Sequence, residues 1–346
     1  MSRTRSKKTV SKKGKDKSVV IVGCNGFIGR RILKYLETNP KYKKVIAVDC
    51  NKPSVTLKKT KYYKLDLTAT MADVTLAEIL KDENCDMLIH TAVPMSPMRN
   101  EPLAHEVIAI GTFYVINACN EAGVRKIVMA STTDVYGAFP ENPNFLTEDM
   151  PPKGNLQSRF LADKIDAEKQ AIKFQKKHPQ SVVTVLRHTT ILGPTIDSFK
   201  TRYLRRAAVM TMLGFDPLLQ FVHEDDVINA FIKMIDEDHP GIFNLGGDGV
   251  LPLSRVLEIA GSYNLKLTQI GFKTLVQLLW FADVSPAPST FADFLRYICV
   301  VDNTKIKTTV KFTPKYTTKE TLLSFVAAQR LKKMELEESQ APEYAV

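Results

Sequence analysis

The chain has 346 residues, of which 44% are hydrophobic and 25% charged, an ordinary balance for a globular protein with a buried core. Its polar, cationic beginning lacks the apolar segment of a secretory signal, and no run of eighteen apolar residues predicts a membrane-spanning helix. The five cysteines are scattered and contain no CxxC pair. We therefore expect reduced thiols in a cytoplasmic protein, without a disulfide framework or a metal site.

The net charge of +11 is concentrated at the N-terminus. Residues 1–18 contain eight Lys or Arg and one Asp, which leaves +4 for the rest of the chain. A segment this polar cannot bury enough apolar surface to fold alone, so residues 1–17 are predicted to be a disordered basic tail. Contact of this tail with nucleic acid or another anionic surface stays a hypothesis. Base stacking is disfavoured because no aromatic residue lies among the charges.

Short apolar runs alternate with amphipathic helices from Ser18 to about Thr190. We expect strands over residues 18–23, 45–50, 62–67, 86–93, 126–132 and 181–188, and helices over residues 26–37, 73–81, 103–122 and 158–177. This alternation predicts an α/β fold, a Rossmann-type doubly wound parallel sheet with helices on both faces. Residues 18–190 are assigned to this nucleotide-binding domain.

The pattern loosens after Thr190, which predicts a smaller C-terminal substrate lobe over residues 191–330. Segments 220–235 and 241–247 are expected to return to the main sheet, whereas segments 195–220 and 250–300 form the lobe itself. The apolar run at 272–281 is expected to pack in the core, with an apolar substrate channel, a dimer face or a membrane contact as alternatives. The charged residues 331–346 are expected to be a frayed C-terminal tail.

A glycine-rich turn follows the first predicted strand. Gly23, Gly26 and Gly29 stand where glycines allow a tight turn, close backbone approach to a pyrophosphate, and close packing of helix on strand. The helix that begins here directs free N–H groups at the phosphates. Asp49 ends the next strand, where a carboxylate binds ribose hydroxyls and disfavours the 2′-phosphate of NADP. We therefore expect NAD, although Lys52 nearby weakens the discrimination.

The GxxGxxG spacing and several downstream segments resemble the extended short-chain dehydrogenase/reductase family, which includes nucleotide-sugar epimerases and dehydratases. The resemblance covers nearly all of residues 18–328, through KLDLT (64–68), HTAV (90–93), GTFYVINAC (111–119), ASTTDVYG (130–137), LRHTTILGP (186–194), FVHEDDVINAF (221–231) and FNLGG (243–247). It implies an NAD site formed by Gly23, Asn25, Gly26, Phe27, Ile28, Gly29, Asp49, Asp66, Leu67, Thr91, Ala92 and Lys164.

The same resemblance places the family's catalytic Ser or Thr, Tyr and Lys on Thr132, Phe160 and Lys164. In this family the phenol carries a proton while a hydride passes to or from the nicotinamide. The Lys lowers the phenol's pKa, and the Ser or Thr orients the reacting oxygen. Phe160 has no proton to give, and loss of such a group typically slows a reaction by about 10²–10⁴. Ile108, at a position where relatives often have Asn, is a second departure from the pattern.

Tyr136, His188 and His223 are the candidate replacements for the missing proton carrier. His188 is the strongest on position, since it stands where the family commonly has Pro and since histidine titrates near neutral pH. The first hypothesis is an NAD-dependent, epimerase/dehydratase-like oxidoreductase with an altered proton relay. The second is a non-catalytic NAD-binding sensor or scaffold, and a nucleic-acid-binding protein is a third that rests on the tail alone.

The substrate implied by the resemblance is a nucleotide-sugar or a related alcohol or carbonyl compound. Arginine forks match diphosphate oxygens, and they are offered by Arg202 and Arg205, with Arg187 and Arg206 as further candidates. A basic, solvated helix explains the sequence RYLRRAA equally well. The resemblance also implies a homodimer that pairs the helices over residues 103–122 and 158–177 in a four-helix bundle.

Overall fold

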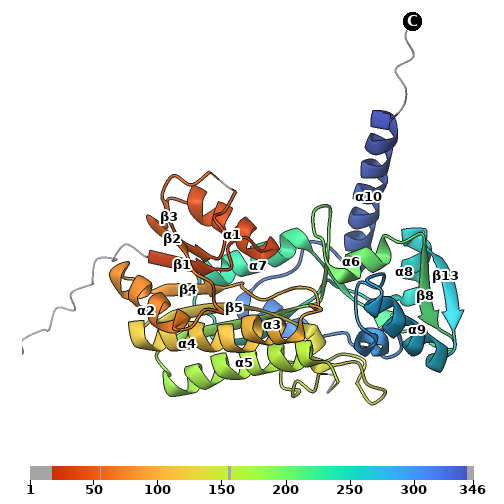
Figure 1. Cartoon of the computed structure of the whole chain (residues 1–346), viewed down its shortest axis with the longest axis horizontal. Coiled ribbons are helices and arrows are strands. Elements are labelled where there is room, and N and C mark those ends of the chain that lie inside the picture. The colour runs from red at the N-terminus through yellow and green to blue at the C-terminus, as the bar shows by residue number, and fades with distance from the viewer. Residues whose placement is uncertain (1–17, 55, 155–156, 341–346) are drawn as a thin grey trace, which may run out of the picture.

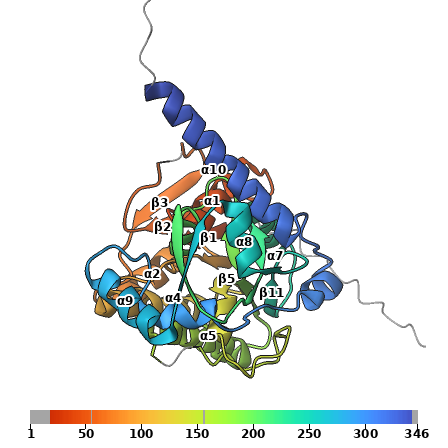
Figure 2. The same ribbon diagram turned by 90° about the vertical axis from the view of Figure 1, so that its right-hand side faces the viewer.

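A computed structural model describes residues 18–340 except 55 and 155–156 (Figure 1). The predicted basic tail therefore lies outside the described residues. The remaining chain forms a large sheet domain and a smaller lobe beside it, from which the C-terminal helix projects in both ribbon views (Figures 1 and 2).

Seven parallel strands form the central sheet, in the order β11-β6-β5-β4-β1-β2-β3. Their bounds are β1 Ser18–Val22, β2 Lys44–Asp49, β3 Thr60–Lys64, β4 Met87–His90, β5 Lys126–Thr132, β6 Val182–His188 and β11 Gly241–Leu245. This arrangement confirms the predicted doubly wound α/β fold. The strand order changes direction between β1 and β4, and ligands of such sheets bind in the crevice at that point.

Helices cover both faces of the sheet, which is why its central strands are apolar almost without interruption. One face carries α2 (Ala72–Asp82), the segments α3 (Glu101–His105), η1 (Glu106–Ile110) and α4 (Gly111–Ala122), and α5 (Arg159–Lys177). The other face carries α1 (Phe27–Thr38) and α7 (Glu224–Asp236). Gly123 ends α4 in a left-handed conformation with φ of 66°, as predicted.

The helix that spans residues 101–122 contains a π turn, η1, between α3 and α4. Of the described helices, this one is long and apolar enough to cross a membrane. The mean hydropathy of its most apolar stretch is 1.2. In this fold it packs against α2 and α5, and 44% of its most apolar stretch is buried. Packing within the fold thus accounts for the buried part of this apolar stretch.

The lobe is built from short elements after residue 190. They are α6 (Phe199–Leu204), β8 (Ala208–Met212), β9 (Leu218–Leu219), β12 (Leu251–Pro252), α8 (Leu253–Ala260), β13 (Tyr263–Leu267), α9 (Gln269–Phe281) and the 3₁₀ helix η3 (Ser289–Leu295). The segment 241–245 joins the main sheet as β11, as expected. In the segment 220–235, the strand β10 (Phe221–His223) does not join the sheet and pairs with β7 (Thr190–Leu192) instead, whereas α7 packs on a face of the sheet as expected.

The C-terminal helix α10 (Thr318–Gln340) packs Leu322, Phe325 and Val326 into the core of the lobe and then extends beyond it (Figure 2). The frayed end expected from residue 331 is helical as far as Gln340. Residues 331–335 read LKKME, all of them strong helix formers, which explains the continuation. Residues 341–346 lie outside the described part of the chain.

A buried ion pair connects the sheet to α5. Both side chains of the pair, Arg187 on β6 and Glu168 on α5, are 1% exposed. Arg187 Nε lies 3.0 Å from each carboxylate oxygen of Glu168, and Nη2 donates a third bond at 2.5 Å. Ser131 on β5 also donates to this carboxylate, and the ring of Tyr136 lies 4.7 Å from the guanidinium. Arg187 is therefore committed to the core, and its expected role with a diphosphate is wrong.

Replacing Glu168 with Ala is expected to lower the free energy of unfolding by about 3–5 kcal/mol, because the guanidinium of Arg187 stays buried without its charge partner. Urea unfolding followed by circular dichroism measures the change. Asp166→Ala is the control on the same helix, since it removes only an exposed pair with Lys169 and should cost less than about 1 kcal/mol. Equal losses of unfolding free energy in the two variants would show that the buried pair stabilises the fold no more than the exposed pair does.

Candidate functional site

The glycine turn after β1 is held by close backbone contacts. Gly23 has a φ of 84°, and a Cβ on it would lie 2.3 Å from the backbone N of Ala92. A Cβ on Gly29 would lie 2.1 Å from the carbonyl oxygen of Gly23, which also accepts a 3.0 Å hydrogen bond from Thr91 Oγ1. The fold itself thus requires these two glycines, and their contacts fix the N-terminus of α1 at the point where the strand order changes.

Gly26 differs from both, because the protein leaves room for a side chain there. A Cβ on Gly26 would meet no atom closer than 3.5 Å. Gly26 instead borders a cleft of about 360 Å³ in front of α1, and the first turn of α1 has no acidic residue. A side chain would fill this space at the free N–H groups of the helix, so the missing Cβ fits the approach of a pyrophosphate.

The remaining predicted cofactor residues lie around this turn. Asp49 Oδ2 accepts a 2.9 Å bond from the backbone N of Asn25, so the carboxylate also holds the glycine loop. Asp66 is exposed and accepts bonds from Thr68 N and Oγ1 at 2.9 and 2.8 Å. Leu67 is buried. The residues that border the cleft itself, out of those predicted, are Gly26, Phe27, Ile28, Thr91, Thr132, Phe160, Lys164 and His188.

Lys164 is the most perturbed cation of the cleft. Its side-chain Nζ donates to the carbonyl oxygen of Pro94 at 2.9 Å and lies 4.8 Å from the centre of the Phe160 ring. Burial lowers the pKa of Lys164 to about 8. The Phe160 ring packs on Phe291, with centroids 6.2 Å apart. The ammonium therefore faces an aromatic ring where the family would provide a phenol, and its pKa lies near physiological pH.

Thr132 and His188 border the same cleft at the ends of β5 and β6. The Thr132 hydroxyl accepts a 3.3 Å bond from the backbone N of Asp134 and so caps the 3₁₀ helix η2 (Thr133–Tyr136). His188 Nδ1 lies 2.8 Å from the carbonyl oxygen of Thr189, so this nitrogen carries the proton and donates. Burial lowers the pKa of His188 to about 4, and the ring is therefore neutral at pH 7.

The other two candidate proton carriers are engaged elsewhere. The Tyr136 hydroxyl donates to Asn244 Oδ1 at 2.9 Å, and its side chain is buried. His223 Nε2 lies 3.1 Å from Ser324 Oγ, and the ring stacks on Tyr316 at 4.0 Å. Neither residue is among the described residues that border the cleft. The structure thus brings only His188, of the three replacements considered, to the site.

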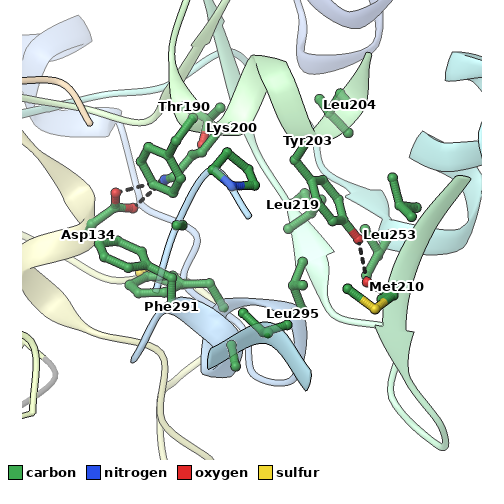
Figure 3. Close-up of a pocket in the computed structure, with 18 of the residues that line it drawn as sticks. Asp134, Thr190, Lys200, Tyr203, Leu204, Met210, Leu219, Leu253, Phe291 and Leu295 are labelled. Carbon is green, nitrogen blue, oxygen red and sulfur yellow. Dashed lines mark hydrogen bonds and ion pairs between the residues drawn. The ribbon is translucent and has the colours of Figure 1, made fainter. Parts of the chain in front are cut away.

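A second cavity of about 190 Å³ adjoins the cleft on the side of the lobe (Figure 3). Its border with the cleft contains an ion pair that the sequence analysis did not identify: Lys200 Nζ lies 2.7 Å from both carboxylate oxygens of Asp134. Asp134 occurs in the ASTTDVYG segment, whose motif directed attention to Thr132 and Tyr136. Lys200 occurs in the loosely patterned region, where no spacing marked it.

The two arginines predicted to bind a diphosphate are turned to another partner. Arg202 and Arg205 each pair with Asp197 at 2.7 Å, and neither is among the described residues that line the cleft or the second cavity. Asp197 is the physical reason, because it offers a carboxylate to both guanidiniums, five and eight residues before them in the chain. In the described residues, no group of three or more His, Cys, Asp or Glu is placed to hold a metal ion.

Comparison with known proteins identifies a family and several proteins that this chain resembles. Residues 19–246 match the sequence model of the NAD dependent epimerase/dehydratase family. An uncharacterised protein of Mycobacterium tuberculosis is 29% identical over 307 residues, which cover 88% of this chain and 82% of the relative. UDP-glucuronate 4-epimerase of Thermodesulfobacterium geofontis is 26% identical over 293 residues, 78% of this chain and 88% of its own. The solved structure of MoeE5 in complex with UDP-glucuronic acid and NAD has a TM-score of 0.70 at 21% identity, covering 91% of this chain and 99% of MoeE5.

Gly26→Asp is expected to keep the fold but to weaken NAD binding by at least about tenfold. Asp is favourable as the residue that precedes a helix, yet its carboxylate would occupy the cleft and repel phosphates. Isothermal titration with NAD and thermal melting measure the two effects. Gly23→Ala is the contrasting variant, because its Cβ collides with backbone and should lower the melting temperature sharply. Normal NAD affinity in a folded Gly26→Asp protein would argue against the cleft as the pyrophosphate site.

Proposed function

Because the chain belongs to the NAD-dependent epimerase/dehydratase family, we propose that it binds NAD and exchanges a hydride with the carbinol or carbonyl carbon of a small molecule. The observation that carries this proposal is a single cleft that runs from Gly26 at the helix N-terminus to Thr132 and Lys164. The substrate is a nucleotide-sugar or a related alcohol or carbonyl compound. Two of the similar proteins support the first class, since their names include UDP-glucuronate or UDP-glucuronic acid.

The residues proposed to hold NAD fall into two groups. The helix N-terminus at Gly26 binds the pyrophosphate, and Asp49 binds the adenosine ribose. Lys164 and Thr132 lie at the other end of the cleft, where the nicotinamide is expected. NAD⁺, when bound there, supplies the hydride acceptor.

Lys164 is proposed as the proton carrier in place of the missing phenol. Oxidation of a secondary alcohol here would release a hydride from carbon, for which bound NAD⁺ would be the acceptor, and a proton from oxygen, which the neutral amine of Lys164 would accept. A pKa of about 8 suits this exchange, since a general base works best with a pKa near the working pH. His188 is the weaker candidate because its pKa of about 4 leaves it a poor base near neutrality.

A second candidate function is a non-catalytic NAD-binding sensor or scaffold. The observation in its favour is Phe160, which has no proton to give and packs its ring on Phe291 in the core. Under this reading the cleft binds NAD, and Lys164 contributes to cofactor binding alone.

We further propose a cytoplasmic homodimer. The scattered, unpaired cysteines support a reducing compartment. Leu103 and Phe113, on the helix over residues 101–122, are 39% and 46% exposed, which supports association of this helix and α5 with a second copy. Contact of the basic residues 1–17 with an anionic surface stays a hypothesis.

Phe160→Tyr separates the two functions. If Lys164 carries the proton, the wild-type protein should oxidise a substrate, and the added phenol should change kcat by less than about tenfold. That change is well below the roughly 10²–10⁴ that a missing acid–base group costs. The absorbance of NADH measures turnover, and NAD affinity should be equal in both proteins. Activity in the variant alone would establish the sensor or scaffold instead.

The rate of alcohol oxidation should depend on the protonation of Lys164. The neutral amine is the active form, so kcat/KM is expected to rise with pH through about 8 and then to level off. For reduction of a ketone the ammonium is needed, and the rate should fall over the same range. Lys164→Met should remove this step, whereas His188→Ala should retain it. A step that disappears in His188→Ala would assign the proton to the histidine.

A further inference from the structure

The second cavity opens directly onto the proposed reaction site. It shares Asp134, Thr189, Thr190, Phe199 and Lys200 with the cleft that contains Thr132, Lys164 and His188. The cavity extends from there into the lobe, between α6, β8, β9 and η3 (Figure 3). A molecule bound in it would therefore have one end at the cleft and the rest of its body in the lobe.

The walls of this cavity are apolar. Side chains from several elements of the lobe form them, among them Val209, Met210, Leu219, Leu253, Phe291 and Leu295. Most of the polar side chains on the walls already have partners within the protein. Tyr203 donates to the carbonyl oxygen of Met210 at 2.9 Å, Ser285 to that of Ala287 at 2.6 Å, and Gln220 to those of Gly247 and Val301 at 3.0 and 3.2 Å.

The cavity offers little positive charge to a diphosphate. Two of its described lining residues are cations, Lys200 and Arg206. Lys200 is neutralised by Asp134, whereas Arg206, whose Nη2 donates to the carbonyl oxygen of Val284, has no carboxylate partner among the described residues. Two phosphate charges moved against this wall would meet one unneutralised cation and would be incompletely paired, which is unfavourable, whereas burial of hydrocarbon there is favourable at roughly 25 cal/mol per Å².

One buried hydroxyl at the border of the cleft and the cavity has no partner. Thr189 is 2% exposed and lines both, and its Oγ1 makes no hydrogen bond in the described structure. Buried hydroxyls are normally paired, so an orphaned one beside a cavity indicates a position for a ligand's polar atom. The site thus combines an unpartnered buried hydroxyl at its border with the cleft and a hydrocarbon-lined body.

We propose that this cavity binds an apolar molecule that carries a hydroxyl or keto oxygen at one end, with that oxygen at Thr189 and the hydrocarbon body against the walls of the lobe. This inference narrows the proposed substrate to an apolar alcohol or ketone. It rests on the proposed function for the hydride transfer. The binding itself does not depend on NAD.

Binding is tested first with the fluorescent hydrocarbon probe N-phenyl-1-naphthylamine, on the full chain without NAD. Leu219→Glu and Met210→Glu each place a charge on the cavity wall, and each should weaken binding of the probe by at least tenfold. Leu278→Glu is the matched control, because Leu278 lies on α9, is 61% exposed and is outside the described lining of the cavity. Circular dichroism checks that each variant is folded. Equal binding by all four proteins, or no binding by the wild type, would overturn the proposal.

The polar end is tested by competition of 2-decalol and decalin against the probe. Replacing Thr189 with Val keeps the shape but removes the hydroxyl, so the preference for 2-decalol over decalin should fall by about two- to tenfold. An unchanged preference would remove Thr189 from the site. Displacement of the probe by UDP-glucuronic acid, and not by 2-decalol, would assign the cavity to a nucleotide-sugar.

A separate titration with NAD tests the proposed function independently of the apolar site. Probe binding without NAD binding would contradict the proposed function and leave the apolar site standing. NAD binding without probe binding would contradict the apolar site and leave the proposed function standing.

Discussion

The buried ion pair between Arg187 and Glu168 is the interaction on which the geometry of the site depends. Ser131, which donates to Glu168, immediately precedes Thr132 on β5. Arg187 immediately precedes His188 on β6, and Glu168 lies one helical turn after Lys164 on α5. Three elements that carry residues of the cleft are thereby connected to one another. Charges this deeply buried hold their partners tightly, because any separation leaves an ion without water or a counterion.

The glycine turn shows why a motif and its function are separate questions. Its three glycines are equally spaced in the sequence, and together with the strand before them, the helix after them and Asp49 they predicted a dinucleotide site. In the structure Gly23 and Gly29 are needed by the packing of β1, α1 and β4, and only Gly26 leaves space that the protein does not fill. The argument for a ligand therefore rests on the one glycine whose replacement the fold would accept.

Much of the fold could be predicted because it depends on local patterns. Buried parallel strands read as continuous apolar runs, and Gly123 marks the end of a helix, so the sheet and its helices were confirmed. The pairing of β10 with β7 could not be predicted, since it depends on how segments outside the main sheet pack in three dimensions. The partner of Arg187 was missed for a similar reason, because tertiary packing brings Glu168 of α5 to it. Arg202 pairs with Asp197, five residues before it, a local pair that the sequence analysis did not consider. The pair of Lys200 with Asp134 joins two regions 66 residues apart, and no sequence spacing identifies it.

The ion pair of Asp134 and Lys200 also has a consequence for selectivity. Its side chains are 10% and 23% exposed, and they lie at the boundary between the cleft that contains Lys164 and the hydrocarbon-lined cavity. A long apolar molecule can lie across that boundary in one direction, with its oxygen toward Thr189. An oxygen in the middle of the same skeleton would remain inside the apolar walls, away from Lys164. The protein would then be regioselective, distinguishing isomers of identical composition by the position of one oxygen atom along the carbon skeleton.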